Sequence, residues 1–268
     1  MTDADALDLL RLVESVARAA GQTAVRYRTS AELAVTSTKS SPTDVVTAAD
    51  TAVEAQIRAA VAGQRPFDAV VGEEGDDAAG TSGLRWVVDP IDGTVNYLYG
   101  SSRYAVSIAV EDEAGPLVAV VHAPAIDETF TAARGHGSWR DGDRIEASGC
   151  GSLAEALVGT GFGYRVERRR RQAEVLATVL PLVRDIRRAG AAALDLCDVA
   201  CGRLDAYYEQ GLKPWDLAAG RLVATEAGAA VSGLAGREPG EAMVVAAGAR
   251  LHPLLETVLT DLDADRPS

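Results

Sequence analysis

Apolar residues near the start of the chain recur every three or four positions, which predicts a helix that continues towards Arg28. The apolar positions of this helix are Leu9, Leu10, Leu12, Val13, Val16 and Ala20. A second helix is expected after Thr47, whose side chain suits an N-cap, and Gly63 is its expected stop. The polar stretch 36–44 has no apolar period, so we interpret it as a loop.

The middle of the chain changes to short apolar runs bounded by turn residues, a pattern typical of strands. These runs are residues 69–71, 86–88, 104–110 and 117–122. Residues 112–115 and 141–142 suit hairpin turns. Helices return at 166–180, 194–202 and 215–227, with short strands near 157–159, 206–208 and 243–246. Alternating helices and sheets predict a layered α/β or α+β sandwich.

The 268 residues are 47% hydrophobic and 24% charged, which is typical of a folded chain with a large core. We expect a single domain over 1–268, with approximate lobes at 1–150 and 151–268. The net charge of -13 argues against nucleic acid as a partner, because binding a phosphate backbone needs a basic surface. The sequence contains no signal-peptide pattern and no apolar run long enough to cross a membrane, so we expect a cytoplasmic protein without membrane contact.

Residues 89–97, Asp-Pro-Ile-Asp-Gly-Thr-Val-Asn-Tyr, begin where the apolar run 86–88 stops. Pro90 lacks an amide proton for a ladder hydrogen bond, so we expect the strand to end there. The dipeptide Asp92-Gly93 permits a tight turn, and a short helix is expected directly afterwards. This geometry directs two carboxylates at one small volume.

The carboxylates of Asp89 and Asp92 repel each other when both are ionised and close together, unless one takes up a proton or a cation neutralises both. Magnesium suits such a place, because it prefers oxygen ligands and is usually held by a few carboxylates together with substrate phosphate. The amides of Gly93 and Thr94, at the start of the expected helix, suit a phosphate oxygen. The motif therefore predicts a magnesium and phosphate site.

Two further acidic elements repeat this design. Glu73 follows the apolar run 69–71, and Asp216 lies near the start of the helix expected at 215–227. Each piece alone has an ordinary explanation, since acidic loops are usually solvated and an aspartate at a helix start is usually a cap. Their joint occurrence indicates that carboxylates from three separate elements converge.

Segments 72–74, 89–97 and 215–220 resemble, in order and spacing, the signature motifs of the inositol monophosphatase family, and the similarity extends over 39–228. The resemblance implies a layered αβαβα sandwich of the inositol monophosphatase and fructose-1,6-bisphosphatase type. It also implies magnesium-dependent hydrolysis of small-molecule phosphate monoesters, foremost myo-inositol 1-phosphate, by metal-activated water. A homodimer and inhibition by lithium are further implications.

The resemblance implies roles for individual residues. Two to three Mg²⁺ ions would be held by Glu73, Asp89, the Ile91 carbonyl, Asp92 and Asp216. The catalytic groups that orient the attacking water would be Glu73, Thr94 and Asp50. The substrate contacts would be Asp92, Gly93, Thr94, Gly190, Ala191, Ala192, Glu209 and Asp216. Lys39 lies in a segment that is similar to the family's mobile loop, and Ala191 stands where relatives often carry Ser or Thr.

Other functions stay open at this point. Phosphatases for histidinol phosphate, sugar phosphates or nucleotide 3'-phosphates would share the metal site and differ at the pocket rim. A different class is a non-catalytic regulatory binding module, which only the arginine run 168–171 favours. We interpret that run as a solvated helix face. Arg187 and Arg188 are expected at an edge of the substrate pocket.

Overall fold

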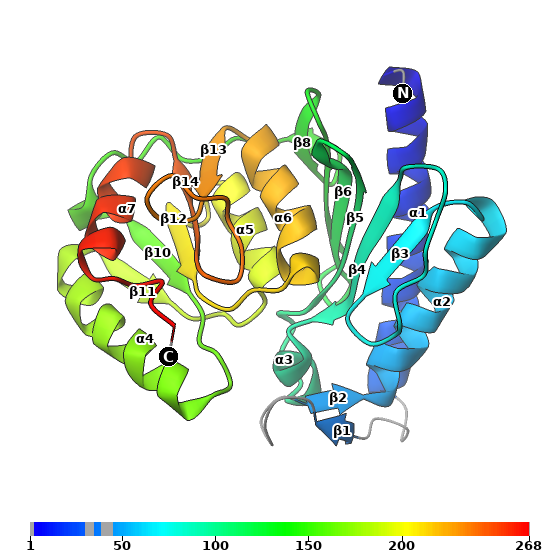
Figure 1. Ribbon diagram of the computed structural model, residues 1–268, viewed down its shortest axis with the longest axis horizontal. Coiled ribbons are helices and arrows are strands. Elements are labelled where there is room, and N and C mark those ends of the chain that lie inside the picture. The colour runs from blue at the N-terminus through cyan, green and yellow to red at the C-terminus, as the bar shows by residue number, and fades with distance from the viewer. Residues whose placement is uncertain (1–2, 30–34, 39–44, 268) are drawn as a thin grey trace.

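Five layers stack across the molecule in the order αβαβα (Figure 1). The computed structural model describes residues 3–29, 35–38 and 45–267. Helices α1 and α2 form one outer layer, a seven-stranded sheet follows, and α5 and α6 fill the centre. A five-stranded sheet and the outer helices α4 and α7 complete the stack. The predicted fold class, a layered αβαβα sandwich, is confirmed.

The first sheet has the strand order β3-β4-β5-β6-β7-β8-β9, with β3 parallel to β4 and all later neighbours antiparallel. Tight turns explain this simple order: Asp112 pairs with Gly115, and Asp141 and Gly142 have positive φ values of 52° and 87°. Both predicted hairpins are confirmed. The strands are β3 (Ala69–Gly72), β4 (Arg85–Asp92), β5 (Ala105–Asp112), β6 (Gly115–Ala123), β7 (Glu128–Ala133), β8 (Gly137–Arg140) and β9 (Asp143–Arg144).

Helices α1 (Asp3–Thr29) and α2 (Ala48–Gln64) cover one face of this sheet. Their apolar faces share a core with the sheet through buried side chains such as Val13, Ile57 and Trp86. Thr47 caps α2, because its hydroxyl accepts the Ala49 amide, so the predicted N-cap is confirmed. Among the described helices, none is both long and apolar enough to cross a membrane.

The prediction of a loop at 36–44 is wrong for its first residues, because β1 (Val35–Thr38) pairs antiparallel with β2 (Val45–Thr47). Backbone pairing with a neighbouring strand needs no apolar period, so the polar composition gave no signal for this hairpin. Residues 39–44, including Lys39, lie outside the described residues, and the role expected for Lys39 stays a prediction.

The second sheet has the order β11-β10-β12-β14-β13 and lies beyond residue 150, where we placed the lobe boundary. Strands β11, β10 and β12 are parallel, while β14 is antiparallel to both β12 and β13. The assignment of 1–268 to a single domain stays a prediction. The strands are β10 (Leu157–Thr160), β11 (Asp185–Arg187), β12 (Ala206–Glu209), β13 (Ala229–Ser232) and β14 (Val244–Gly248).

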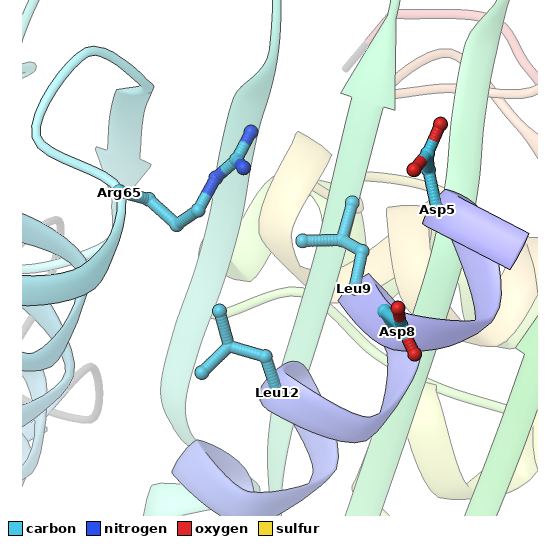
Figure 2. Close-up of a pocket in the computed structure, with 5 residues that line it drawn as sticks. All are labelled: Asp5, Asp8, Leu9, Leu12 and Arg65. Carbon is cyan, nitrogen blue, oxygen red and sulfur yellow. The ribbon is translucent and has the colours of Figure 1, made fainter. Parts of the chain in front are cut away.

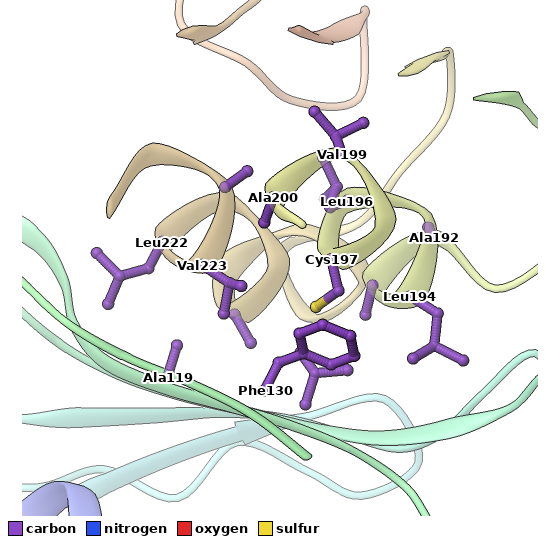
Figure 3. Close-up of a cluster of buried hydrophobic side chains, with 14 of the residues drawn as sticks. Ala119, Phe130, Ala192, Leu194, Leu196, Cys197, Val199, Ala200, Leu222 and Val223 are labelled. Carbon is purple, nitrogen blue, oxygen red and sulfur yellow. The ribbon is translucent and has the colours of Figure 1, made fainter. Parts of the chain in front are cut away.

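The central layer packs small residues between the two sheets (Figure 3). Phe130 and Cys197 are fully buried there, and the helices meet closely because a methyl group at Gly220 would lie 2.8 Å from Leu196. The outer helices α4 and α7 cover the far face of the second sheet with a separate apolar cluster. The helices are α3 (Thr94–Leu98), α4 (Val166–Val179), α5 (Ala192–Ala200), α6 (Pro214–Glu226) and α7 (His252–Asp261), with 3₁₀ turns at Leu153–Glu155 and Leu180–Leu182.

Strand β4 continues to Asp92, so the predicted end of the strand at Val88 is wrong. The neighbouring strand β3 does end at this level, because its last residue, Gly72, pairs with Val88. The pairing with β5 persists from Asp89 to Asp92 with a shift in register. Pro90 is tolerated because its missing amide proton falls within this irregularity, where no regular ladder bond is needed. The bulge, and not a strand end, carries the central motif.

Candidate active site

A cavity of about 420 Å³ is lined by the four carboxylates that were expected to converge, and also by those of Glu209 and Glu241. Glu73 follows β3, Asp89 and Asp92 lie in the bulge of β4, and Asp216 is in the first turn of α6. Ile91, Gly93 and Thr94 line the same cavity. The structure therefore brings together the acidic residues whose convergence the sequence predicted.

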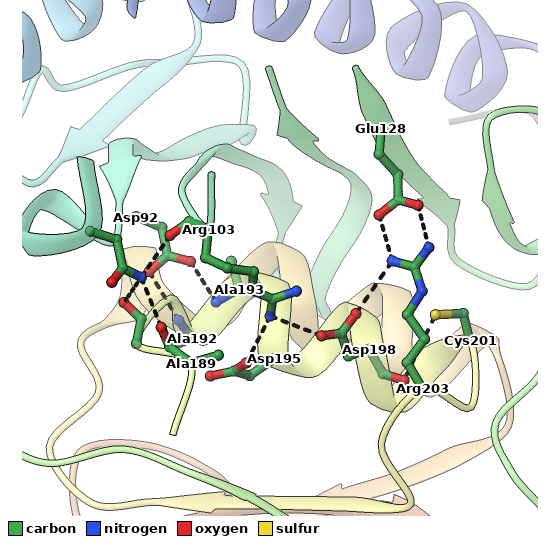
Figure 4. A network of polar contacts seen from close by, with 12 residues as sticks. Asp92, Arg103, Glu128, Ala189, Ala192, Ala193, Asp195, Asp198, Cys201 and Arg203 are labelled. Carbon is green, nitrogen blue, oxygen red and sulfur yellow. Dashed lines mark hydrogen bonds and ion pairs between the residues drawn. The ribbon is translucent and has the colours of Figure 1, made fainter. Parts of the chain in front are cut away.

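Both carboxylates of the bulge are held by backbone amides. The Asp89 side chain is 1% exposed, and its Oδ1 accepts the Ile91 amide at 3.0 Å. The two oxygens of Asp92 accept the Ala192 and Ala193 amides at 3.0 and 2.9 Å (Figure 4). These amides begin α5 and have no partner within the helix, so Asp92 satisfies two donors and faces the positive end of the helix dipole.

Asp216 occupies the third position of α6, and its Oδ2 accepts the Lys213 amide at 2.7 Å. Its placement near the helix start is as predicted. Glu73 lies in a loop that Glu54 of α2 holds from beneath: the buried Glu54 carboxylate accepts the amides of Glu74 and Gly75 at 2.8 and 2.9 Å. Sequence patterns did not indicate this support, because Glu54 lies outside the acidic segments.

Burial and mutual repulsion disfavour the ionised form of these carboxyls. Burial raises the pKa of Asp89 well above its ordinary value, and the charges of Glu73, Asp92 and Asp216 raise it further. Burial also raises the pKa of Asp216, as does the charge of Glu73. For Asp92, burial raises the pKa to about 7, although the amides of α5 act in the opposite direction. The carboxyl groups of the cluster thus resist ionisation, and a bound cation would favour their ionised form.

These shifts predict how stability depends on pH in the absence of divalent cations. The folded chain keeps a proton on Asp92 up to about pH 7, whereas the ordinary pKa is 3.8, so the native state binds more protons in this window. Stability therefore falls as the pH rises from about 4 to about 7, by about 1.4 kcal/mol per pH unit for each extra proton. Urea unfolding in EDTA should show a steeper fall for the wild type than for Asp92→Asn, and equal slopes would contradict the prediction.

The donor set fits magnesium. It consists of carboxylate oxygens and the Ile91 carbonyl, the hard ligands that this ion prefers. In the described part of the chain, no three acidic, histidine or cysteine side chains already form a group that could hold an ion by themselves. The carboxylates thus surround the cavity without closing a coordination shell. Magnesium tolerates this, because it keeps several waters and takes further oxygens from substrate phosphate.

Thr94 links the cavity to Asp50. Its hydroxyl lies 3.2 Å from Oδ1 of Asp50 and 3.1 Å from the Ile91 carbonyl oxygen, and one proton can serve only one of them. Asp50 is fully buried and also accepts the amide and hydroxyl of Thr47. Burial raises the pKa of Asp50 to about 6, against the lowering effect of the Thr47 hydrogen bonds. The expected contact between Asp50 and Thr94 is therefore present.

Of the residues predicted to contact the substrate, all but Ala191 line the cavity. Gly190, Ala192 and Glu209 line the cavity, whereas the Ala191 side chain is 1% exposed and belongs to the central core. Glu209 accepts a hydrogen bond from the Tyr207 hydroxyl. Burial raises its pKa. A methyl group at Gly161 would lie 1.8 Å from a Glu209 oxygen, so this glycine makes room for the carboxylate.

Two polar residues that we did not single out hold the walls of the cavity together. Asn96 donates to the carbonyls of Arg103 and Ala189 at 2.7 and 2.8 Å, which ties α3 to the segment before α5. Arg103 reaches Asp195 at 2.9 Å and Asp198 at 2.8 Å, both on α5 (Figure 4). Asn96 lies within the motif 89–97, which was its only signal. Nothing in the sequence pointed to Arg103, because its partners are about ninety positions away.

The arginines behave differently from the sequence interpretation. Arg188 lines the cavity as expected, but Arg187 is exposed, pairs with Asp185 and is not among the lining residues. The run 168–171 is a solvated face only in part, since Arg168 also lines the cavity. Arg171 donates to the Leu262 carbonyl. Arg168 and Arg171 are three positions apart, so helical periodicity places both of them on the same face of α4.

A second depression, of about 330 Å³, lies between α1 and the end of α2 (Figure 2). Its carboxylates, Asp5 and Asp8, come from one turn of α1, and Arg65 is paired with Asp68 at 2.8 Å. Leu9 and Leu12 supply the remaining wall. This depression lacks carboxylates from separate elements, so the candidate chemistry belongs to the acidic cavity.

Comparison with known proteins agrees with this geometry. Residues 6–262 match the model of the inositol monophosphatase family. Inositol-1-monophosphatase SuhB of Mycobacterium tuberculosis is 48% identical over 220 residues, covering 79% of this chain and 76% of that protein. Nus factor SuhB of Pseudomonas aeruginosa is 40% identical over 235 residues, covering 85% and 86%.

A solved structure extends the likeness to three dimensions. The extragenic suppressor protein suhB from Bartonella henselae has a TM-score of 0.88 at 34% identity, covering 94% of this chain and 98% of that one. The family model and these relatives span most of the chain, including the three elements that carry the four acidic residues. This chain therefore belongs to the inositol monophosphatase family of phosphoric monoester hydrolases.

Proposed function

We propose that the protein hydrolyses phosphate monoesters in a magnesium-dependent reaction, with myo-inositol 1-phosphate as the foremost substrate. The observation that supports this most is the convergence of Glu73, Asp89, Asp92 and Asp216 on one cavity. Burial and repulsion raise the pKa of Asp89 and Asp216, so the cluster needs a cation to stay ionised near neutral pH. Magnesium ions would satisfy that need and would supply charge stabilisation to the phosphoryl oxygens.

The ligands would divide between two principal ions. Glu73, Asp89 and the Ile91 carbonyl would hold one, while Asp89, Asp92 and Asp216 would hold the other, with Asp89 shared between them. A third, looser ion would contact Glu73. Bound magnesium would supply charge stabilisation for the phosphoryl oxygens and lower the pKa of a water.

The chain's own residues orient the attacking water. With the Ile91 carbonyl engaged as a ligand, the Thr94 hydroxyl donates to Asp50, and its lone pairs remain free to accept from water. Glu73 accepts a hydrogen bond from that water. The water oxygen attacks phosphorus and the ester P–O bond breaks. One proton of the water passes through solvent to the leaving alkoxide, and the other stays on the released phosphate. No covalent phosphoenzyme is formed.

A phosphate-release assay tests the proposal. Purified protein is assayed with and without magnesium on myo-inositol 1-phosphate, histidinol phosphate, fructose 1,6-bisphosphate and 3'-phosphoadenosine 5'-phosphate. We expect release from the inositol ester that EDTA abolishes and that Asp92→Asn loses while it remains folded by circular dichroism. Release that is independent of divalent cations, or undiminished in Asp92→Asn, would overturn the proposal.

Glu54 gives a prediction about positioning. Glu54→Gln should raise the magnesium concentration for half-maximal activity by roughly fivefold to twentyfold, because a neutral amide holds the amides of Glu74 and Gly75 less firmly. Glu54 pairs with Arg58, four positions on, at 2.7 Å. Glu14→Gln is the matched control, since Glu14 pairs in the same way with Arg18 at 2.9 Å but lies on α1. An unchanged magnesium requirement in Glu54→Gln would refute the role.

A regulatory binding role is the second candidate, favoured by the 40% identity to a protein named Nus factor SuhB. Such a role needs no turnover, so Asp89→Asn should still complement loss of a regulatory function while it fails in catalysis. Homodimer formation, lithium inhibition and a cytoplasmic location stay predictions. Light scattering and a lithium titration of activity would test the first two.

A further inference from the structure

Two loops that line the proposed active-site cavity continue from neighbouring parallel strands of the second sheet. The ladder between β10 and β12 ends with Thr160 opposite Tyr208. Beyond this pair, Gly163 in one loop and Gln210 in the other both line the cavity. Loops at the carboxyl ends of strands lack the ladder hydrogen bonds that fix the distance between the strands. The separation of the two loops therefore depends on contacts outside the ladder.

The side chain of Gln172, on α4, supplies such contacts. Its Oε1 accepts the Gly163 amide at 2.9 Å, and its Nε2 donates to the Gln210 carbonyl at 3.3 Å. A side-chain amide carries both a donor and an acceptor, as a peptide group does, so it bridges the two loops where the ladder has ended. Gln172 is not among the residues that line the active-site cavity, so it supports this wall without facing the substrate.

The Glu209 carboxylate lies beside this bridge. Glu209 is the last residue of β12 and directly precedes Gln210. A small cavity of about 10 Å³ is lined by Gln172 together with Glu209 and Gln210. A space of this size holds one water at most, so the side chains around it are closely packed. A shift of either loop would therefore move Glu209.

Both ends of the bridge are fixed to the rest of the protein. Val175, three positions after Gln172 and thus on the same side of α4, is buried in an apolar cluster with Tyr208 of β12. The Gln210 side chain is 5% exposed, and its Nε2 donates to the Arg266 carbonyl at 3.1 Å. Gln172 thus joins a packed helix to a segment that is itself tied to the end of the chain.

We propose that Gln172 is a positioning residue, which holds the loops after β10 and β12 at the separation that lets Glu209 accept hydrogen bonds from the hydroxyls of the substrate alcohol. This inference rests on the proposed phosphatase function and adds a residue to substrate recognition in that site. The proposed magnesium ligands belong to β4, the loop after β3 and α6. Gln172 should therefore affect the binding of the alcohol more than the chemical step.

Two variants of Gln172 test this role with myo-inositol 1-phosphate and saturating magnesium. Gln172→Met removes both hydrogen bonds and keeps the length and helix propensity of the side chain. We expect KM to rise about fivefold, the range of one neutral hydrogen bond, while kcat stays within about twofold of wild type. Gln172→Glu keeps an acceptor for Gly163 but cannot donate to Gln210, so it should raise KM as well.

Gln56→Met is the matched control. Gln56 is also a half-buried helical glutamine with a side-chain partner on another element, because it accepts the Thr23 hydroxyl at 2.5 Å, but it links α2 to α1. It should leave KM and kcat unchanged. An unchanged KM in both Gln172 variants, a fall in kcat as large as the rise in KM, or the same change in the control would overturn the inference.

A double-mutant cycle tests whether Gln172 acts through Glu209. In a Glu209→Ala background, Gln172→Met should change KM by less than about twofold, because the carboxylate that it positions is gone. A further fivefold rise would show that Gln172 acts on the site by another route and would contradict the inference, leaving the phosphatase function intact. A wild-type protein without magnesium-dependent turnover would overturn the proposed function and this inference together.

Discussion

Asp89→Asn should lower kcat by at least about 10³-fold at saturating magnesium, which corresponds to roughly 4 kcal/mol of lost transition-state stabilisation. Asp89 is 1% exposed, lies in the β4 bulge and feels the charges of Glu73, Asp92 and Asp216. It is the carboxylate proposed to bridge both ions, so an amide at this position weakens both sites together. Steady-state phosphate release is the measurement.

The same substitution should stabilise the chain when divalent cations are absent. Removing one buried carboxyl relieves the repulsion that raises the neighbouring pKa values. Asp112→Asn is the matched control, because Asp112 lies at the other end of the same sheet and pairs with Arg134 at 2.9 Å. A variant of Asp89 that keeps more than a tenth of wild-type kcat would show that the cluster is not the catalytic centre.

Arg103→Met should destabilise the fold by about 3 kcal/mol, because it leaves buried carboxylates without their counter-charge. Arg103 is 27% exposed and reaches both Asp195, which is 2% exposed, and Asp198, which is 11% exposed. Oδ2 of Asp195 has no hydrogen-bond partner among the described residues, so that carboxylate depends strongly on the arginine. Urea denaturation measures the loss.

Two further variants identify the cause. Arg203→Met is the surface control: Arg203 is 41% exposed, pairs chiefly with Glu128 and lies 3.5 Å from Asp198, which keeps Arg103 as its partner, so its loss should cost about 1 kcal/mol or less. The double variant Arg103→Met with Asp195→Asn should regain part of the lost stability, because the uncompensated charge is gone. If Arg103→Met costs no more than Arg203→Met, the buried network does not stabilise α5.

This network connects stability to the site. Arg103 holds α5, and the first amides of α5 hold the Asp92 carboxylate (Figure 4). Loosening α5 should therefore also lower activity at a given magnesium concentration. The reason is that Asp92 accepts hydrogen bonds from the first amides of α5, which have no partner within the helix.

Local patterns were sufficient to predict the parts of the fold that are specified locally. The helix at the N-terminus, the Thr47 cap and both hairpins depend on neighbouring residues, and the structure confirms them. The acidic residues that follow apolar runs or lie at a helix start were enough to predict their convergence, although Asp89 and Asp92 lie in a bulge and not at a strand end. The strands β11, with three residues, and β13, with four, were missed because so few positions carry little periodicity. The six-residue strand β7 and the ten-residue helix α7 were missed as well.

Features that depend on distant partners could not be predicted. Proline suggested a strand end at Val88, whereas pairing with β5 carries β4 on to Asp92. The support of Glu73 by Glu54 requires α2 to lie beneath the β3 loop, which no local pattern shows. The run 168–171 divides between solvent and cavity according to the orientation of α4, and that orientation is set by tertiary packing.

The most direct measurement is a crystal structure with manganese, which replaces magnesium at oxygen sites and is located by its anomalous scattering. We expect anomalous peaks inside the cavity, one coordinated by Glu73, Asp89 and the Ile91 carbonyl and one by Asp89, Asp92 and Asp216. Peaks found only elsewhere on the protein would contradict this expectation, provided that protein from the dissolved crystals still needs the metal for turnover.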